Sequence, residues 1–178
     1  QKDFPEIVNT VRFSNWSGLM KNGQQVFEEK NIQLTDNSIF SVFDFPLLKG
    51  NPKTALSAPD EIVISENMAV KYFGKNWAAN PALLGQVFRM NDQADFKLAG
   101  VVENVPDSSS IQFDFLLPIE YLFRSDKWSN KWNSNNYHSY LLLKPQTDVA
   151  KLGSLLEKQL GVYHEDKSTT LHLQPLAS

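Results

Sequence analysis

The stretch that decides the fold reads SIFSVFDFPLLKG at residues 38–50, IVISE at 62–66 and KYFG at 71–74. Its first part predicts a short amphipathic helical turn that runs into an extended segment and ends at Gly50. Its later parts predict a buried strand followed directly by a helix, because Ser65 can cap that helix and Gly74 can end it. The apolar residues of this helix share one face: Met68, Ala69, Tyr72 and Phe73.

Turn signals and alternating apolar residues divide the flanking sequence into strands. Asn22-Gly23 predicts a hairpin with a type I′ turn, because both central positions of that turn favour positive φ. Asn91-Asp92 predicts a second hairpin. Between Ile111 and Leu117 apolar and polar residues alternate, as in a strand with one buried face. The strands expected from these patterns are 6–13, 16–21, 24–28, 86–90, 95–105 and 111–117.

The last third of the sequence predicts a β-α-β unit. A strand at 137–144 is followed by a turn at 145–148, in which Asp148 can cap a helix. We expect that helix to end at Gly161 and a final strand to follow at 169–173. The polar, Asn-rich segment 125–139 is expected to be a surface loop. The apolar face of the predicted helix consists of Val149, Leu152, Leu156 and Leu160.

Composition excludes several classes of protein. With 178 residues and 42% hydrophobic content, the chain can bury one good core or two smaller ones that share an interface. A net charge of −3 gives no electrostatic reason to expect nucleic acid as a partner. The absence of cysteine removes disulfides, thiolate nucleophiles and Cys-type zinc sites. No apolar run approaches the roughly 18 residues that a membrane span requires.

Residues that could support catalysis form no known pattern. The histidines 138, 164 and 172 lack the His-Glu-x-x-His relation, so we expect no metal site. We interpret the acidic pairs Glu28-Glu29 and Asp60-Glu61 as solvated charges rather than acid–base groups. No Gly-x-Ser-x-Gly elbow is present, and Gly74-Lys75 lacks the P-loop context. We therefore predict no catalytic residues, no cofactor and no metal, in a protein that is not an enzyme.

Two tryptophans are candidate partner contacts. Trp128 and Trp132 stand four residues apart among polar neighbours, so they could form an exposed aromatic pair if the segment is helical. The alternative is that both rings cover the core under a long loop. Both interpretations stay open at this point.

Several further motifs resemble a known family in their order and spacing. They are FPEI at 4–7, NP at 80–81, GQV at 85–87, FKLAGVV at 96–102, SIQFDFLLP at 110–118, YLLLKP at 140–145 and LQPL at 173–176. Together with the 38–74 stretch, they resemble the extracytoplasmic core domain of MacB-like and FtsX-like ABC transporter permeases of the Bacteroidetes type. Ala82-Leu83-Leu84 departs from the family spacing by added residues, and we expect that region to loop out.

The resemblance implies a two-lobed α+β fold. Residues 1–27 and 119–178 would form a porter-like β-α-β lobe whose first strand and helix are truncated. Residues 28–118 would form an inserted β-rich lobe. The chain would then be a piece of a longer permease, located at the periplasmic face of the bacterial inner membrane.

The resemblance also implies a noncatalytic function. The domain would couple ATP hydrolysis by a cytoplasmic ABC ATPase to conformational change in the envelope, for export of a peptide, antibiotic or lipoprotein-type substrate or for signalling. Its partners would be a second permease protomer, that ATPase, and a periplasmic adaptor or outer-membrane protein. The alternative is a free-standing envelope module that binds a peptide, lipid or glycan in an aromatic-lined cleft.

Overall fold

The computed structural model describes residues 3–125, 137–163 and 170–176. In these parts of the chain the strands are β1 (Ile7–Asn22), β2 (Gln25–Thr35), β3 (Leu47–Gly50), β4 (Glu61–Ser65), β5 (Val87–Met90), β6 (Ala94–Val102), β7 (Phe115–Pro118) and β8 (His138–Leu143). The helices are α1 (Ile39–Val42), α2 (Glu66–Phe73), the 3₁₀ helix η1 (Trp77–Ala79), α3 (Glu120–Ser125) and α4 (Val149–Tyr163). The fold is therefore mixed α+β, as the sequence predicted.

Six of these strands form a closed circuit of hydrogen-bonded neighbours. β2 pairs with β1 and β7, β4 lies between β7 and β6, and β5 connects β6 back to β1. The closure makes a small barrel, which leaves few exposed strand edges. Outside the circuit, β3 adds to β6 and β8 adds to β1.

Alternate residues of the barrel strands face two different cores. Ile62 and Ile64 of β4 belong to one buried cluster, whereas Val63 between them belongs to the other. This is the period of two that a β-strand imposes. All six barrel strands contribute to the first cluster, which therefore fills the barrel interior. Its buried strand residues are Met20, Ile32, Leu34, Ile62, Ile64, Phe88, Met90, Phe96, Leu98, Val101, Phe115 and Leu117.

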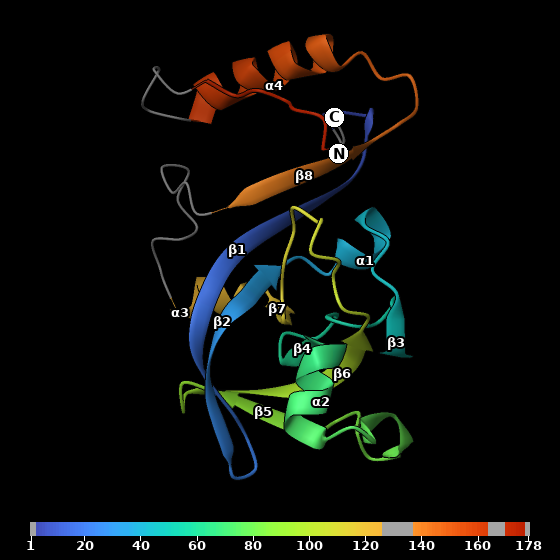
Figure 1. The fold of residues 1–178 in the computed structure, drawn as a ribbon. Coiled ribbons are helices and arrows are strands. Elements are labelled where there is room, and N and C mark those ends of the chain that lie inside the picture. Colours follow the sequence, from blue (N-terminus) through green and yellow to red (C-terminus); the bar gives the residue numbers. More distant parts are fainter. Residues whose placement is uncertain (1–2, 126–136, 164–169, 177–178) are drawn as a thin grey trace.

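β1 extends from one end of the molecule to the other. It begins beside β8 and α4, where both ends of the chain also lie, and it ends at the hairpin with β2 at the opposite end (Figure 1). Its N-terminal part pairs with β8 from Ile7 to Phe13, and its C-terminal part pairs with β2 and β5. β1 is thus shared by the barrel and by the unit that contains β8 and α4.

The local capping and turn predictions are largely confirmed. Ser65 caps α2, because its Oγ accepts a hydrogen bond from the N–H of Met68 at 3.3 Å, and Gly74 follows the helix with a φ of 79°. Asp148 caps α4 by accepting from the N–H of Lys151 at 3.0 Å. Asn91-Asp92 forms the second hairpin, with a φ of 50° and 54° at these two residues.

The first hairpin forms, but its predicted turn type is wrong. Asn22 pairs with Gln25, so Gly23 and Gln24 are the central residues, and of these only Gly23 has a positive φ, 57°. A type I′ turn requires positive φ at both central positions. The observed register places Met20 opposite Phe27, which gives the buried methionine an apolar neighbour across the strands.

Two predicted strands are shortened or missing. β7 begins at Phe115, whereas 111–114 joins no ladder, although Ile111 and Phe113 are buried on either side of the exposed Gln112 as predicted. The side chain of Gln112 instead donates to the carbonyl oxygen of Pro106 at 2.7 Å, within its own loop. Residues 170–173 form no strand, and residue 169 lies outside the described residues. In both segments apolar and polar residues alternate because every second side chain is more buried. Such burial does not require the backbone to pair with another strand.

Two other details also differ from expectation. α4 continues to Tyr163, so Gly161 does not end it, because a glycine ends a helix by adopting the left-handed conformation and Gly161 does not adopt it. The segment at Ala82-Leu83-Leu84 forms no helix or strand, as expected of a loop, but its Leu83 is fully buried in the barrel cluster. The predicted lobe boundary after residue 27 falls inside β2, and the one after residue 118 falls at the end of β7. The division into lobes stays a prediction.

Candidate functional site

At Phe13, β1 passes from the barrel to the β8 unit. Phe13 pairs with Thr35, the last residue of β2, on one edge and with His138, the first residue of β8, on the other. From there toward Ile7, β8 continues along one edge of β1, whereas β2 has ended. The backbone groups on the second edge of β1 therefore need other hydrogen-bond partners.

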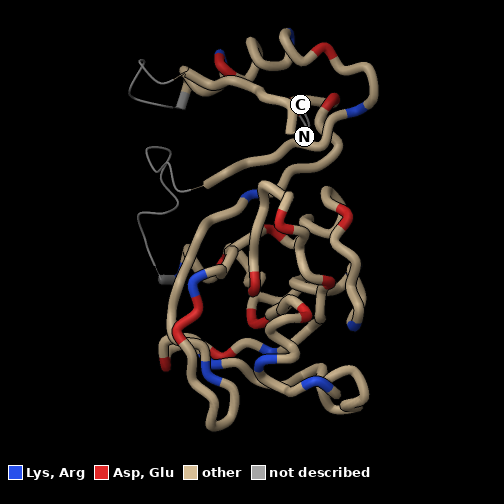
Figure 2. Tube along the Cα trace, viewed as in Figure 1, with Lys and Arg blue, Asp and Glu red and all other residues tan. Residues whose placement is uncertain are grey.

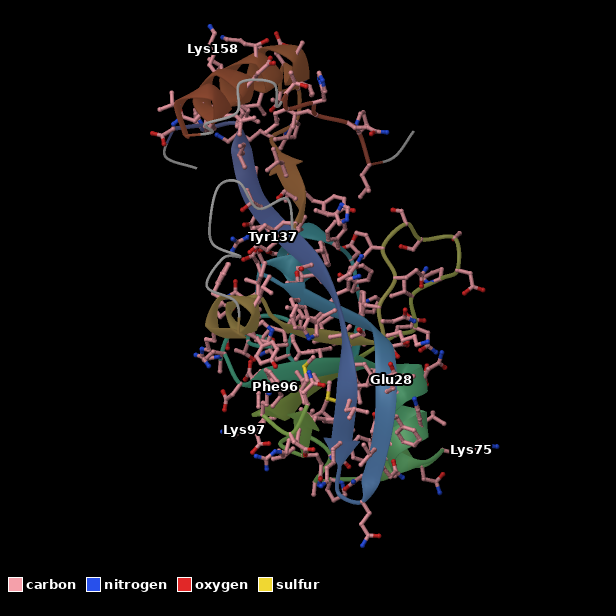
Figure 3. All side chains as sticks on the ribbon, turned by 90° about the vertical axis from the view of Figure 1, so that its left-hand side faces the viewer. Glu28, Lys75, Phe96, Lys97, Tyr137 and Lys158 are labelled. Carbon is pink, nitrogen blue, oxygen red and sulfur yellow. The ribbon has the colours of Figure 1, made fainter. Side chains whose placement is uncertain are left out.

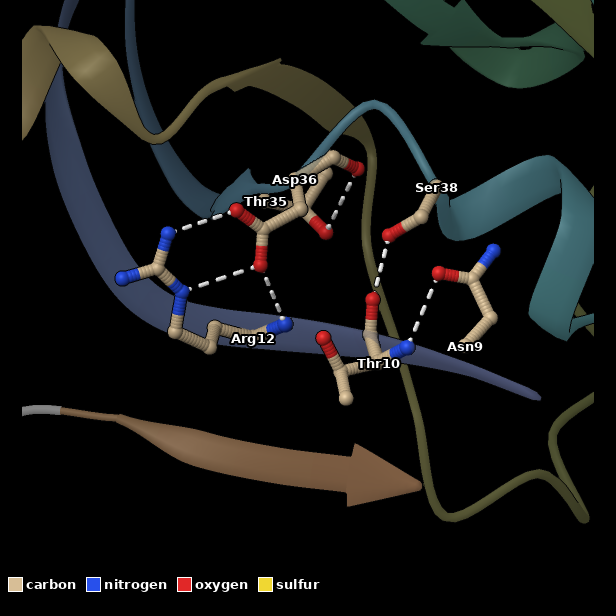
Figure 4. Close-up of polar contacts among 6 residues, drawn as sticks. All are labelled: Asn9, Thr10, Arg12, Thr35, Asp36 and Ser38. Carbon is tan, nitrogen blue, oxygen red and sulfur yellow. Dashed lines mark hydrogen bonds and ion pairs between the residues drawn. The ribbon is translucent and has the colours of Figure 1, made fainter. Parts of the chain in front are cut away.

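Side chains that follow β2 supply those partners, as Figure 4 shows. The N–H of Arg12 donates to Oδ2 of Asp36 at 2.8 Å. Ser38 Oγ donates to the carbonyl oxygen of Thr10 at 2.6 Å, and Asn9 Oδ1 accepts from the N–H of Thr10 at 2.9 Å. Side chains thus satisfy this edge of β1 without a neighbouring strand.

Asp36 also binds the side chain of Arg12. The guanidinium donates from Nε to Oδ2 at 3.0 Å and from a terminal nitrogen to Oδ1 at 2.7 Å, which is a two-point carboxylate contact. The bond from Asp36 raises the pKa of Arg12 above its ordinary value, against the opposing effect of burial. The rings of Phe123 and Tyr137 lie 5.5 and 5.6 Å from the guanidinium carbon.

Aromatic rings pack around the same point of β1. The ring centroid of Phe43, just after α1, lies 5.9 Å from that of Phe13 in β1 and 5.3 Å from that of Tyr140 in β8. Phe45 lies 5.7 Å from Phe43 and 5.1 Å from Phe113. Apart from the tilted Phe43–Phe45 pair, these contacts are edge-on, which is a preferred arrangement of aromatic rings. We define these five rings together with Arg12, Asp36 and Ser38 as the junction.

Some residues of the junction were recognisable in the sequence and others were not. Phe43 and Phe45 lie in the stretch that decided the fold, yet nothing local marked Arg12 and Asp36, which are 24 residues apart. Trp128 and Trp132, the predicted partner contacts, lie outside the described residues, as does His164. His138 is exposed at the start of β8, and His172 is exposed near the C-terminus. No group of three or more potential metal ligands occurs among residues 3–125, 137–163 and 170–176.

Glu29 corrects the interpretation of the acidic pairs as solvated charges. Its side chain is only 7% exposed and accepts from Lys71 Nζ and from the Tyr72 hydroxyl, each at 2.7 Å. α2 covers Glu29 and supplies both donors, which a sequence pattern confined to β2 could not reveal. Burial, then the bond to Glu29, raises the pKa of Tyr72 above its ordinary value. This cluster fixes α2 against the β1–β2 hairpin.

A groove lies between the start of the chain and α4. It measures about 430 Å³ and is lined by Lys144, Pro145, Asp148, Lys151 and Leu155, among others. Its lining contains no aromatic ring and no histidine. Helices of the described residues are all too short or too polar to cross a bilayer.

The fold is similar to that of three domains of known structure. A domain of a permease protein from Porphyromonas gingivalis shares 26% identity with a TM-score of 0.74, over 90% of this chain and 72% of that one. The periplasmic region of MacB from Actinobacillus actinomycetemcomitans shares 17% identity with a TM-score of 0.62, over 88% and 69% of the two chains. The extracellular domain of the noncanonic ABC-type transporter YknZ from Gram-positive bacteria shares 16% identity with a TM-score of 0.60, over 90% and 80%.

These similarities define a fold that the chain shares with domains of permeases and ABC-type transporters. The family model of the MacB-like periplasmic core domain matches residues 1–159, and the chain belongs to that family. It is therefore a periplasmic domain of a membrane transporter protein, located outside the cytoplasmic membrane. The search of curated proteins gave no match.

Proposed function

We propose that this domain is noncatalytic and transmits conformational change between the membrane part of its permease and the envelope. The observation that carries the proposal is the continuous strand β1, which is shared by the β8 and α4 unit and by the barrel. At about 3.3 Å per residue, its 16 residues extend over roughly 50 Å. A displacement of β8 would therefore reach the barrel through one unbroken backbone.

The junction supports this proposal because its polar contacts lie near the surface. The side chains of Arg12 and Asp36 are 38% and 20% exposed, so they can separate and re-form without opening the barrel interior. A hydrogen bond to a charged group contributes about 1.5–3 kcal/mol, which is small enough for two arrangements to be populated. The barrel interior, by contrast, is fully buried and resists deformation.

The energy for such motion would come from ATP hydrolysis by a partner ATPase on the cytoplasmic side. We propose a second permease protomer as a further partner, and a periplasmic adaptor or outer-membrane protein as a third. The motion would serve export of a peptide, antibiotic or lipoprotein-type substrate, or signalling across the envelope. Family membership in the ABC-type permeases supports the ATPase partnership.

The alternative function, a free-standing binding module, depends on an aromatic-lined cleft. The groove beside α4 does not favour it, because this groove is open and its lining has no aromatic side chain. The aromatic rings of the junction, in contrast, pack against one another rather than around an empty space. The coupling function is therefore the better supported of the two.

Spin labels in the full-length permease test the coupling. Lys158 on α4 and Lys75 just after α2 lie at opposite ends of the domain (Figure 3), and both side chains are exposed. With the permease and its ATPase in lipid nanodiscs, we expect ATP to change the distance between labels at these positions. Labels at Lys75 and Glu28, both on the barrel part, are the control and should keep their distance. An unchanged Lys158–Lys75 distance would overturn the proposal.

A further inference from the structure

Asn91, in the turn between β5 and β6, holds the backbone of β1 at Gly18 and Leu19. The N–H of Leu19 donates to Oδ1 of Asn91 at 2.9 Å, and the N–H of Asn91 donates to the carbonyl oxygen of Leu19 at 2.9 Å. The next residue pair, Met20 with Met90, belongs to the β1–β5 ladder. The Asn91 side chain thus extends this short ladder by one step. We define Gly18, Leu19 and Asn91 as the β1 anchor.

Only glycine fits at position 18 while Asn91 keeps this position. A Cβ atom on Gly18 would lie 2.6 Å from Oδ1 and 2.9 Å from Nδ2 of Asn91, closer than Cβ atoms approach other heavy atoms in proteins. Any larger residue must push the Asn91 amide away from β1. The hydrogen bond from the N–H of Leu19 to Asn91 therefore requires glycine at position 18.

Three locally unfavourable features meet at the anchor. The β1–β2 ladder has a bulge between Trp16 and Gly18, next to the point that Asn91 holds. Asn91 and Asp92 both adopt left-handed φ, which costs free energy in residues other than glycine. Such features persist where the surroundings impose them, and they concentrate at functional positions.

The anchor lies where the partners of β1 change. On this edge, β8 pairs with β1 as far as Phe13, and β5 pairs with it at Met20 and Lys21. Between these ladders, no described strand pairs with this edge. The anchor is thus the point at which the barrel first holds this edge of β1 after β8 has ended, whereas β2 pairs with the other edge from Phe13 onward.

We propose that the β1 anchor fixes the point at which movement of the β8 and α4 unit passes from β1 into β5 and β6 of the barrel. The inference rests on the coupling function proposed above. When β8 moves, the stretch of β1 that pairs with β2 alone bends at the bulge, and Asn91 carries the load into the β5–β6 turn. Without the anchor, β1 would shift along β5 and the movement would dissipate before it reached β5 and β6.

Two neighbouring left-handed residues give a matched test. Asn91→Gly and Asp92→Gly each place glycine at a positive φ, but only the first removes the side-chain bond to the N–H of Leu19. In the full-length permease with labels at Lys158 and Lys75, we expect the ATP-dependent distance change to be reduced in Asn91→Gly and retained in Asp92→Gly. Gly18→Ala should cause the same loss by displacing the Asn91 amide.

The outcomes separate this inference from the coupling function. A wild-type permease that shows no ATP-dependent change overturns the coupling function and the anchor with it. A wild type that moves, with either folded anchor variant moving equally, overturns the anchor alone. If both variants act through the same contact, adding Gly18→Ala to Asn91→Gly should produce no further loss, because the contact is already absent. A further loss in the double variant would contradict a shared contact.

Discussion

At the scale of single residues, the carboxylate of Asp36 takes the place of a strand beside β1. It accepts the backbone N–H of Arg12 and also binds the guanidinium of the same residue (Figure 4). The sequence alone could not reveal this pair, because the two residues are brought together only when β1 and β2 form their hairpin. Phe43 and Phe45 were recognisable earlier, since apolar residues clustered around Pro46 already implied a packed segment.

Replacing Asp36 by asparagine tests the strength of the junction. The amide keeps the shape of the side chain but loses the charge that holds Arg12, so we expect the free energy of unfolding to fall by about 1–2 kcal/mol. Urea denaturation of the 178-residue chain would measure this. Lys97→Gln is the control, because Lys97 and Asp60 form an ion pair with side chains 65% and 45% exposed, which should contribute nothing measurable. Equal effects of the two variants would contradict the prediction.

At the scale of helices and strands, the sequence predicts the elements whose ends are determined by neighbouring residues. α2 was predictable in full because its cap, its apolar face and its final glycine all lie within ten residues. The ends of β7 were not, since the burial of Ile111 and Phe113 alternates as in a strand although their backbone joins no ladder. Strand pairing depends on distant partners, so a period of two predicts which side chains are buried but not where hydrogen bonding begins.

Two glycines with positive φ allow the cost of backbone strain to be measured apart from the cost of steric overlap. One is Gly74, which follows α2, and the other is Gly50, at the end of β3. Gly74 has a φ of 79° with nothing within 4 Å of an added Cβ, whereas at Gly50, with a φ of 102°, that atom would lie 2.5 Å from the carbonyl oxygen of Ala99. We expect Gly74→Ala to destabilise the domain by about 1–2 kcal/mol. Gly50→Ala should cost about 1–3 kcal/mol more, because it forces β3 away from β6. Thermal unfolding of both variants would show the difference, and equal losses would contradict it.

At the scale of the whole molecule, the resemblance of ordered motifs predicted the family, whereas the closure of the barrel was not predicted. Closure depends on short strand pairings, such as the one between β1 and β5, in which Met20 pairs with Met90 and Lys21 pairs with Arg89. No local sequence pattern marks these pairings. Charged residues of both signs occur in the barrel and in the α4 unit (Figure 2), so charge does not distinguish the two parts either. The strand shared between them is visible only in three dimensions.

The two parts should differ in local stability, because α4 buries much less than the barrel does. Leu152 is 2% exposed, but Val149, Leu155 and Val162 of the same helix are 42%, 39% and 72% exposed. Amides open locally where few apolar groups are buried, so we expect α4 to exchange hydrogen much faster than β4 and β6, with α2 closer to the strands. Hydrogen-exchange mass spectrometry of the 178-residue chain measures this. Protection of α4 equal to that of β4 would mean that the helix is fixed to the barrel more firmly than its burial implies. Such a rigid attachment would leave the β8 and α4 unit little freedom to move along β1.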